Sequence, residues 1–322
     1  MKTITAGKLG VVICCSVLGL VSGTAGAGKP GNYDSVYVFG DSLSDPGNAY
    51  ALSGTRAQPP YEIIPSAPYT VGGFHFTNGR TWIEHLTAKL GTPNGGKPAF
   101  AKPGRYGNYA IGGSRAGSSG SPLLTFAGQI GAFSQDVGGN APTDALYVVA
   151  FGGNDIRDAL IAAISDPTLA TSQAIIAAAV TAEAQGIAQL YQAGARKFLV
   201  VNAPNVAVTP IVTAQGPQSV AGALLLTQGF NAGLDAALDG LELSLPGIDI
   251  KRVDIFSIVS AIVAAPESEG FSNALDTCIT FGVTNNVYCA QRNQYLFWDS
   301  VHPTAAGHRT IAEIILPLVV GH

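Results

Sequence analysis

The stretch Val36-Tyr37-Val38-Phe39-Gly40-Asp41-Ser42-Leu43 joins an apolar run to a turn that carries a serine. A short apolar run bounded by turn residues is typical of a strand buried in a parallel sheet. Ligands of such sheets bind at the carboxyl ends of the strands, so Ser42 is expected at a functional edge. The structural alternative is that this serine only caps a helix.

A second informative pair stands near the other end of the chain, where Asp299 precedes His302 by three residues. A serine hydroxyl becomes a nucleophile when a histidine removes its proton, and a carboxylate fixes the tautomer of that histidine. The chain has five histidines, and only His302 follows a carboxylate at this spacing. We therefore expect a triad of Ser42, Asp299 and His302. The G-x-S-x-G pattern of α/β-hydrolases is absent around Ser42.

Apolar and helical segments alternate along the rest of the chain. Strands are expected at 35–39, 109–111, 145–151, 197–202 and 248–253, and helices at 81–90, 126–137, 171–193, 218–241 and 304–316. This alternation predicts a parallel sheet that helices cover on both faces. The stretch 91–107, rich in glycine, proline and lysine, is expected to be a long surface loop.

Acyl transfer also needs hydrogen-bond donors aimed at the developing oxyanion. Gly113 offers a backbone N–H just past the short expected strand, and Asn154 offers a side-chain amide after the strand at 145–151. The backbone N–H of Ser42 would be the third donor. A plain turn after a strand is the alternative explanation for Gly152-Gly153-Asn154.

Four blocks, read together, resemble those of the SGNH, or GDSL, hydrolase family: Gly40-Asp41-Ser42-Leu43, Asn108-Tyr109-Ala110-Ile111-Gly112-Gly113, Gly152-Gly153-Asn154-Asp155 and Asp299-Ser300-Val301-His302. They occur in the family's order, and the resemblance extends from about Asp34 to Leu318. The segment from Phe76 to Trp82 looks like one common in the lipase and phospholipase-like branch.

The resemblance implies a flavodoxin-like three-layer α/β/α sandwich with a central parallel sheet, the SGNH hydrolase fold. It implies that Ser42 is the nucleophile, that His302 is the general base and that Asp299 orients it, while Ser42, Gly113 and Asn154 form the oxyanion hole. Asp41 and Asp155 match motif positions too and are interpreted as structural hydrogen-bonding residues. No metal and no cofactor is expected.

The implied activity is that of a serine hydrolase, an esterase or lipase, that cleaves carboxylic esters of small molecules or lipids through an acyl-enzyme. Alternatives on the same site are a phospholipase, a lysophospholipase, an acyltransferase or a carbohydrate deacetylase. A binding module that keeps the fold without catalysis is the contrasting class.

The N-terminus reads as a secretory signal peptide. Lys2 and Lys8 precede the apolar stretch 9–21, and Ala25-Gly26-Ala27 matches a cleavage site. An uncleaved anchor helix is the alternative, although the stretch is too short to span a bilayer. Cleavage after Ala27 would leave a single domain, residues 28–322, secreted or periplasmic and without a transmembrane segment.

Charge and cysteine usage fit that location. Loss of the two lysines with the leader takes the net charge from −4 to −6, which argues against nucleic acid as a partner. Cys278 and Cys289 are the cysteines that remain, and in an exported protein we expect them to form a disulfide. Two buried free cysteines are the alternative.

Two further segments could contribute to a substrate pocket. Residues 198–234 carry no charge, which is compatible with a wall for an acyl chain, although plain core packing is the simpler explanation. The aromatic and proline-rich stretch 59–76 would suit the mouth of a site. Its rings at Tyr61, Tyr69, Phe74 and Phe76 would contact acyl chains or sugars, or cover the core.

Overall fold

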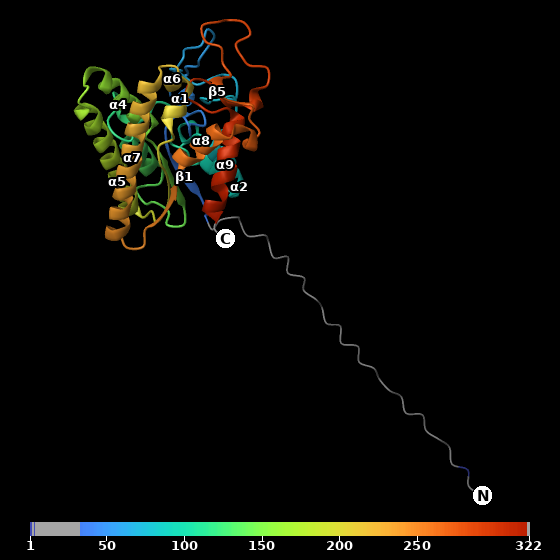
Figure 1. Cartoon of the computed structure of the whole chain (residues 1–322). Coiled ribbons are helices and arrows are strands. Elements are labelled where there is room, and N and C mark those ends of the chain that lie inside the picture. The colour runs from blue at the N-terminus through green and yellow to red at the C-terminus, as the bar shows by residue number, and fades with distance from the viewer. Residues whose placement is uncertain (2, 4–32, 321–322) are drawn as a thin grey trace.

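A four-stranded parallel sheet forms the centre of the computed structural model, which describes residues 1, 3 and 33–320 (Figure 1). The strands lie in the order β1-β2-β3-β4. Their bounds are β1 (Val36–Gly40), β2 (Leu146–Ala150), β3 (Lys197–Val201) and β4 (Asp249–Val253). All three pairings are parallel and in register over five residues, so the four carboxyl ends meet at one edge.

The segment 107–111 runs beside β1 on the side away from β2. Val38 N–H donates to Gly107 O at 2.9 Å, and Tyr109 N–H donates to Val38 O at 2.8 Å. The expected strand at 109–111 is nevertheless wrong in detail, because pairing is limited to isolated bridges at Asn108. Counted with this segment, the order is the 2-1-3-4-5 arrangement of flavodoxin-like folds.

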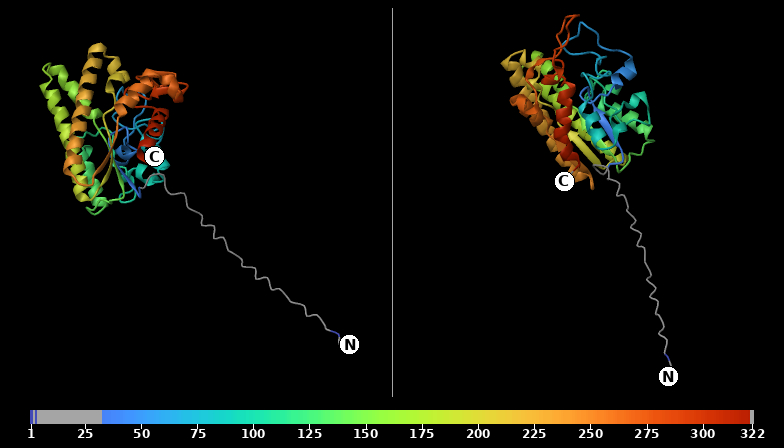
Figure 2. Two further views of the ribbon diagram at one scale, coloured as in Figure 1. Left: turned by 60° about the horizontal axis from the view of Figure 1, so that its bottom comes forward. Right: turned by 90° about the vertical axis from the view of Figure 1, so that its right-hand side faces the viewer.

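Helices cover both faces of the sheet, which makes the three-layer α/β/α sandwich (Figures 1 and 2). One face packs against α3, α5 and α7, and the other against α2, α8 and α9. The helices are α1 (Asn48–Ser53), α2 (Trp82–Lys89), α3 (Phe126–Asp136), α4 (Gly153–Ser165), α5 (Ala170–Ala193), α6 (Pro210–Thr213), α7 (Pro217–Ser244), α8 (Ile255–Ala264) and α9 (Ala305–Val320).

Alternation along β1 explains the two cores. Tyr37 and Phe39 point to the layer with α3, while Val36 and Val38 point to the layer with α2 and α9. Both layers are apolar, so the strand reads as one continuous hydrophobic run. None of the helices in residues 33–320 has the length and the apolar character that crossing a bilayer would need. The expected leader lies outside the described residues.

The stretch 91–107 is not the plain surface loop expected. It contains the short 3₁₀ turns η1 (Pro93–Gly96) and η2 (Ala99–Ala101), and Gly95 and Gly96 are buried. A Cβ at Gly95 would lie 2.7 Å from the Cβ of Val36, so the missing side chain lets this segment pack on β1. Glycine in this stretch therefore permits close packing against the sheet and does not indicate an exposed loop.

Two short strands precede the loop that contains Asp299 and His302. They are β5 (Asn273–Thr277) and β6 (Tyr295–Phe297), paired in parallel apart from the main sheet. Between them Cys278 and Cys289 are joined by a disulfide, with their Cα atoms 4.8 Å apart. Cys278 N–H donates to Phe297 O at 3.0 Å, so the cross-linked loop is attached to the strand that precedes Asp299.

Candidate active site

The turn that follows β1 is held from beneath by Gln129. Its side-chain oxygen accepts from Gly40 N–H at 2.9 Å, and its amide donates to Gly40 O at 2.8 Å. Gly40 needs to be glycine because a Cβ there would lie 2.7 Å from Ala150 O. With both backbone groups of Gly40 bonded, the next residues leave the sheet at a fixed angle, and Ser42 emerges at the carboxyl edge.

Asp41 lies beneath that turn and is buried. Its carboxylate accepts from Leu43 N–H at 3.0 Å. Burial raises the pKa of Asp41 to about 6, because a charge is costly away from water, while the Leu43 hydrogen bond and the nearby His302 oppose that rise. Asp45 links the turn after β1 to the segment before Gly113, since it accepts from the N–H groups of Asn48 at 2.6 Å and Gly112 at 2.8 Å.

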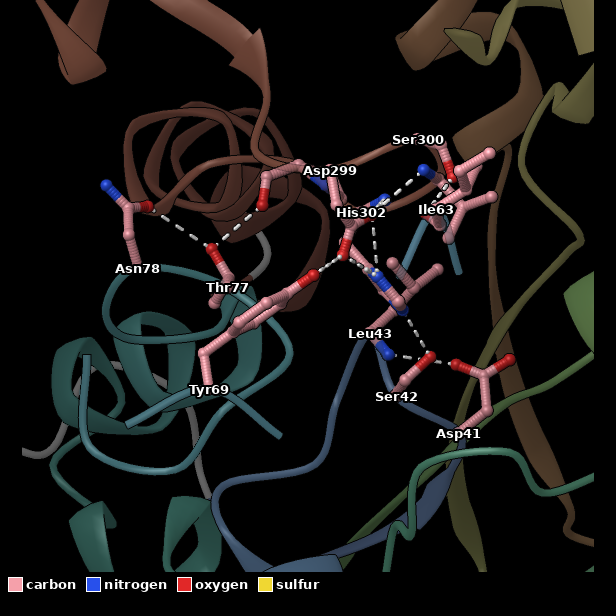
Figure 3. A network of polar contacts seen from close by, with 12 residues as sticks. Asp41, Ser42, Leu43, Ile63, Tyr69, Thr77, Asn78, Asp299, Ser300 and His302 are labelled. Carbon is pink, nitrogen blue, oxygen red and sulfur yellow. Dashed lines mark hydrogen bonds and ion pairs between the residues drawn. The ribbon is translucent and has the colours of Figure 1, made fainter. Parts of the chain in front are cut away.

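The loop between β6 and α9 delivers the acid–base pair. Trp298 N–H donates to His302 O at 2.8 Å, which closes the loop on itself. Thr77 and Asn78, neighbours in Figure 3 from a distant part of the chain, then fasten it. Thr77 Oγ1 donates to Pro303 O at 2.8 Å, and Asn78 Oδ1 accepts from Ala305 N–H at 2.7 Å at the start of α9.

Ser42, His302 and Asp299 meet in a hydrogen-bonded chain (Figure 3). His302 Nε2 lies 2.8 Å from Ser42 Oγ, and His302 Nδ1 lies 2.8 Å from Asp299 Oδ2. A carboxylate can only accept, so it fixes the proton on Nδ1 and leaves Nε2 free to accept from the serine. This is the geometry in which a histidine can remove the serine proton.

Asp299 is completely buried and fully hydrogen-bonded. Oδ1 accepts from Val301 N–H at 2.9 Å and from His302 N–H at 2.8 Å. Oδ2 accepts from the hydroxyl of Tyr69 at 2.9 Å. Burial and the adjacent Asp299 charge both raise the pKa of Tyr69, so its hydroxyl remains a donor. Tyr69 was not anticipated as a partner of the triad, and only its place in an aromatic stretch hinted at a role.

Only one of the four aromatic rings expected at the mouth from the stretch 59–76 lines the cavity. Tyr69 is buried and hydrogen-bonded to Asp299. The hydroxyl oxygens of Tyr61 and Tyr288 lie 2.5 Å apart. Phe74 stacks on Tyr50 with ring centroids 3.7 Å apart. Phe76 is the one of the four rings that lines the cavity beside Ser42, 5.6 Å from the ring of His302.

The three expected oxyanion donors lie on the wall of one cavity. Gly113 has a φ of 82°, a conformation that favours glycine, and Ser42 and Asn154 line the same space. Asn154 donates from Nδ2 to Ser114 O at 2.9 Å, which leaves the other amide hydrogen for a ligand. Asn154 is the second residue of α4, a helix that the sequence did not predict because its glycines suggested a turn.

The buried carboxyl group of Asp155 supports the segment that follows Gly113. Asp155 accepts from the N–H groups of Ala116 at 3.0 Å and Gly117 at 3.2 Å.

Glu183 of α5 is also buried, and neither of its oxygens has a hydrogen-bond partner among the described residues. Burial and the charges of Asp155 and Asp41 raise the pKa of Glu183 to about 8, so this group keeps its proton at neutral pH.

The cavity measures about 900 Å³, near the upper end of the range of small-molecule sites. Apolar side chains from α4, from the β3–α7 connection and from α8 and α9 dominate its walls, among them Leu160, Ile164, Val206, Val212, Val259 and Ile311. The uncharged segment 198–234 thus lines this space as well as the core. Burial lowers the pKa of His308, another wall residue, to about 3, so its ring is uncharged there.

Known proteins resemble this chain over most of its length. The family model of GDSL-like Lipase/Acylhydrolase matches residues 36–315. Two GDSL esterase/lipases of Arabidopsis thaliana are each 28% identical, one over 88% of this chain and 88% of its own length, the other over 87% and 86%. The thermolabile hemolysin of Vibrio parahaemolyticus is 25% identical over 89% of this chain and 64% of its own length.

Among solved structures, an acetylxylan esterase from Geobacillus stearothermophilus superimposes with a TM-score of 0.45 and 13% identity. The match covers 91% of this chain and 97% of that one.

Proposed function

Since the chain belongs to the GDSL-like lipase/acylhydrolase family, we propose that it hydrolyses carboxylic esters through an acyl-enzyme formed on Ser42. The observation that carries this assignment is the Ser42–His302–Asp299 chain, with hydrogen-bonding distances of 2.8 Å at both links. Such a chain of hydroxyl, imidazole and buried carboxylate activates a serine toward acyl groups.

The reaction runs in two steps. Ser42 Oγ attacks the ester carbonyl as its proton passes to His302 Nε2, and the new oxyanion accepts from Ser42 N–H, Gly113 N–H and the Asn154 amide. The tetrahedral intermediate collapses, the ester C–O bond breaks, and His302 gives its proton to the departing alcohol. Water then attacks the acyl-enzyme with His302 again as base, and the acid leaves as Ser42 regains its proton.

The apolar cavity favours esters of long hydrocarbon chains over acetylated sugars. Its walls bring Leu160, Val206 and Val212 into the space that opens from Ser42 and Asn154. A sugar would leave its hydroxyls unpaired against such walls, whereas an alkyl chain gains from burial. A phospholipase or acyltransferase would use the same atoms with a different alcohol or acceptor.

We place the mature protein, residues 28–322, outside the cytoplasm as one domain. The leader-like N-terminus supports this, and so does the Cys278–Cys289 disulfide, because such bonds persist in oxidising compartments. The acidic mature chain does not favour nucleic acid as a partner.

A fluorophosphonate probe tests the assignment directly, because it reacts with a serine that a histidine has activated. We expect stoichiometric labelling with the adduct mapped by mass spectrometry to the peptide that contains Ser42. A panel of p-nitrophenyl esters from acetate to palmitate, beside a phospholipid and an acetylated sugar, then ranks the substrates. Unlabelled protein without esterase activity would favour the binding-module alternative.

The Gly222→Leu variant tests whether acyl chains occupy the part of the cavity that residues of α4 and α7 line. Gly222 lines the cavity from α7, and an added Cβ would meet only the side chain of Leu160, at 3.9 Å. A leucine therefore fits the helix and occupies part of the cavity next to Leu160. Each methylene excluded from burial costs about 0.8 kcal/mol, so kcat/KM for palmitate relative to butyrate should fall about tenfold.

The matched control is Gly229→Leu, two turns further along α7, where a Cβ meets nothing within 4 Å. It should leave the palmitate-to-butyrate ratio as in the wild type. An unchanged ratio in Gly222→Leu would mean that chains lie elsewhere.

A further inference from the structure

Arg157 is the one lysine or arginine among the described residues that line the cavity. It lies on α4 three residues after Asn154, which places both side chains on the same face of the helix, about one turn apart. Four and seven residues beyond it, Ile161 and Ile164 continue the wall and are 58% and 83% exposed. A single positive charge therefore stands between the expected oxyanion donor and an apolar rim.

The charge of Arg157 is only weakly compensated. Its described contact is with Asp158, 3.5 Å from Nη2, the upper limit of a hydrogen bond. Both oxygens of Asp158 already accept from Arg115, at 2.7 Å from Nε and 3.0 Å from Nη2. Arg115 thus neutralises that carboxylate in a two-pronged pair, and Arg157 stays 36% exposed at the cavity.

The other charged groups near Arg157 do not use up its donors. Its charge favours the ionised form of buried Asp41 and so lowers the pKa of that group, but no hydrogen bond joins the two among the described residues. His302 and His308 also face the cavity, and the latter is uncharged. A guanidinium with free donors on the wall of the cavity that holds Ser42 suits an oxyanion-bearing ligand, because its planar fork matches phosphate and carboxylate.

From this arrangement we propose that Arg157 forms an anion subsite, and that the preferred substrate is a fatty acyl ester carrying a phosphate or carboxylate within a few bonds of the ester. The proposal rests on the function proposed above. Arg157 would pair with the anionic group while the apolar walls hold the hydrocarbon chain. It is a specificity-determining residue and takes no part in the proton transfers at Ser42.

The test compares three palmitoyl esters with the wild type, Arg157→Gln and Arg157→Lys. The esters are palmitoyl glycerol, its phosphate derivative and its hemisuccinate, presented in mixed micelles of one neutral detergent. We expect kcat/KM for an anionic ester relative to the neutral ester to fall about tenfold in Arg157→Gln, the loss of one charge-assisted hydrogen bond in a partly exposed setting. Arg157→Lys should recover part of the ratio because it keeps the charge.

A fall in this kcat/KM ratio for the phosphate ester alone, for the hemisuccinate alone or for both supports the subsite. Which ester is affected identifies the anionic group that the subsite binds. Added salt, at about 1 M, should lower the anionic preference of the wild type and leave that of Arg157→Gln unchanged. Active-site titration with the fluorophosphonate probe corrects for misfolded enzyme. The matched control, Arg105→Gln, removes an exposed arginine near the amino end of β1 and should keep the wild-type ratio.

Equal loss of activity toward all three esters in Arg157→Gln would indicate a purely structural role and overturn the subsite. An unchanged ratio would overturn it as well. In both cases the wild type still cleaves esters, so the proposed function survives. If the wild type cleaves none of the three esters but is labelled at Ser42 by the fluorophosphonate probe, the subsite proposal alone fails. If it is also unlabelled and inactive toward the p-nitrophenyl esters, the hydrolase assignment itself fails.

Discussion

Replacement of Ser42 by alanine should reduce kcat for ester hydrolysis by about 10⁶-fold, the scale on which serine hydrolases lose activity without their nucleophile. The variant lacks the hydroxyl that lies 2.8 Å from His302 Nε2, so no acyl-enzyme can form. Substrate binding and the oxyanion donors would survive, which leaves a small rate above that in water. Steady-state hydrolysis of a p-nitrophenyl ester, at high enzyme concentration, measures the residual rate.

The same variant should fold normally. Ser42 is only half-buried, and its hydroxyl contacts the His302 ring and not the backbone that shapes the turn. We expect the melting temperature to stay within a few degrees of the wild type, in line with the small effects of most changes outside the core. Ser53→Ala, an exposed serine at the end of α1, is the matched control and should keep full activity. A Ser42→Ala enzyme with more than about 1% of wild-type turnover would remove Ser42 as nucleophile, since removal of the nucleophile costs far more than that.

The strands and the serine turn were predictable because the sequence signals are local. A strand buried on both faces reads as an uninterrupted apolar run, and Gly40 directly after Phe39 marks where it ends. The expected strands predicted Ser42, Gly113 and Asn154 just past their carboxyl ends, and the three residues line one cavity although the strand expected before Gly113 is absent from the described residues 109–111. Four of the five expected strands and all five expected helices appear within a few residues of their predicted bounds.

Contacts across long sequence distances were not predictable. The hydrogen bond from Tyr69 to Asp299 joins residues 230 positions apart, and no local pattern distinguishes that tyrosine from its neighbours. Gln129 is equally hidden, although it holds both backbone groups of Gly40. The start of α4 was missed for another reason: Gly152 and Gly153 suggested a turn, whereas Gly152, with a φ of 112°, bends the chain directly into a helix.

Asp299→Asn should lower kcat by about 10⁴-fold while the fold is kept. The two backbone N–H groups of Val301 and His302 both donate to Oδ1, so the oxygen of an asparagine would take that place. Its NH₂ group would then occupy the Oδ2 position and donate to His302 Nδ1. That contact stabilises the tautomer with the proton on Nε2, which cannot accept the proton of Ser42.

Tyr69 sharpens this prediction, because its hydroxyl can rotate to accept from the new NH₂ group and so avoid a buried clash. The melting temperature of Asp299→Asn should therefore fall little, whereas both ester hydrolysis and fluorophosphonate labelling slow together. Asp144→Asn, which changes an exposed carboxylate at the far edge of the sheet, should leave both rates unchanged. If Asp299→Asn slowed hydrolysis less than about tenfold, far short of the tautomer effect, His302 would not depend on Asp299 for its orientation.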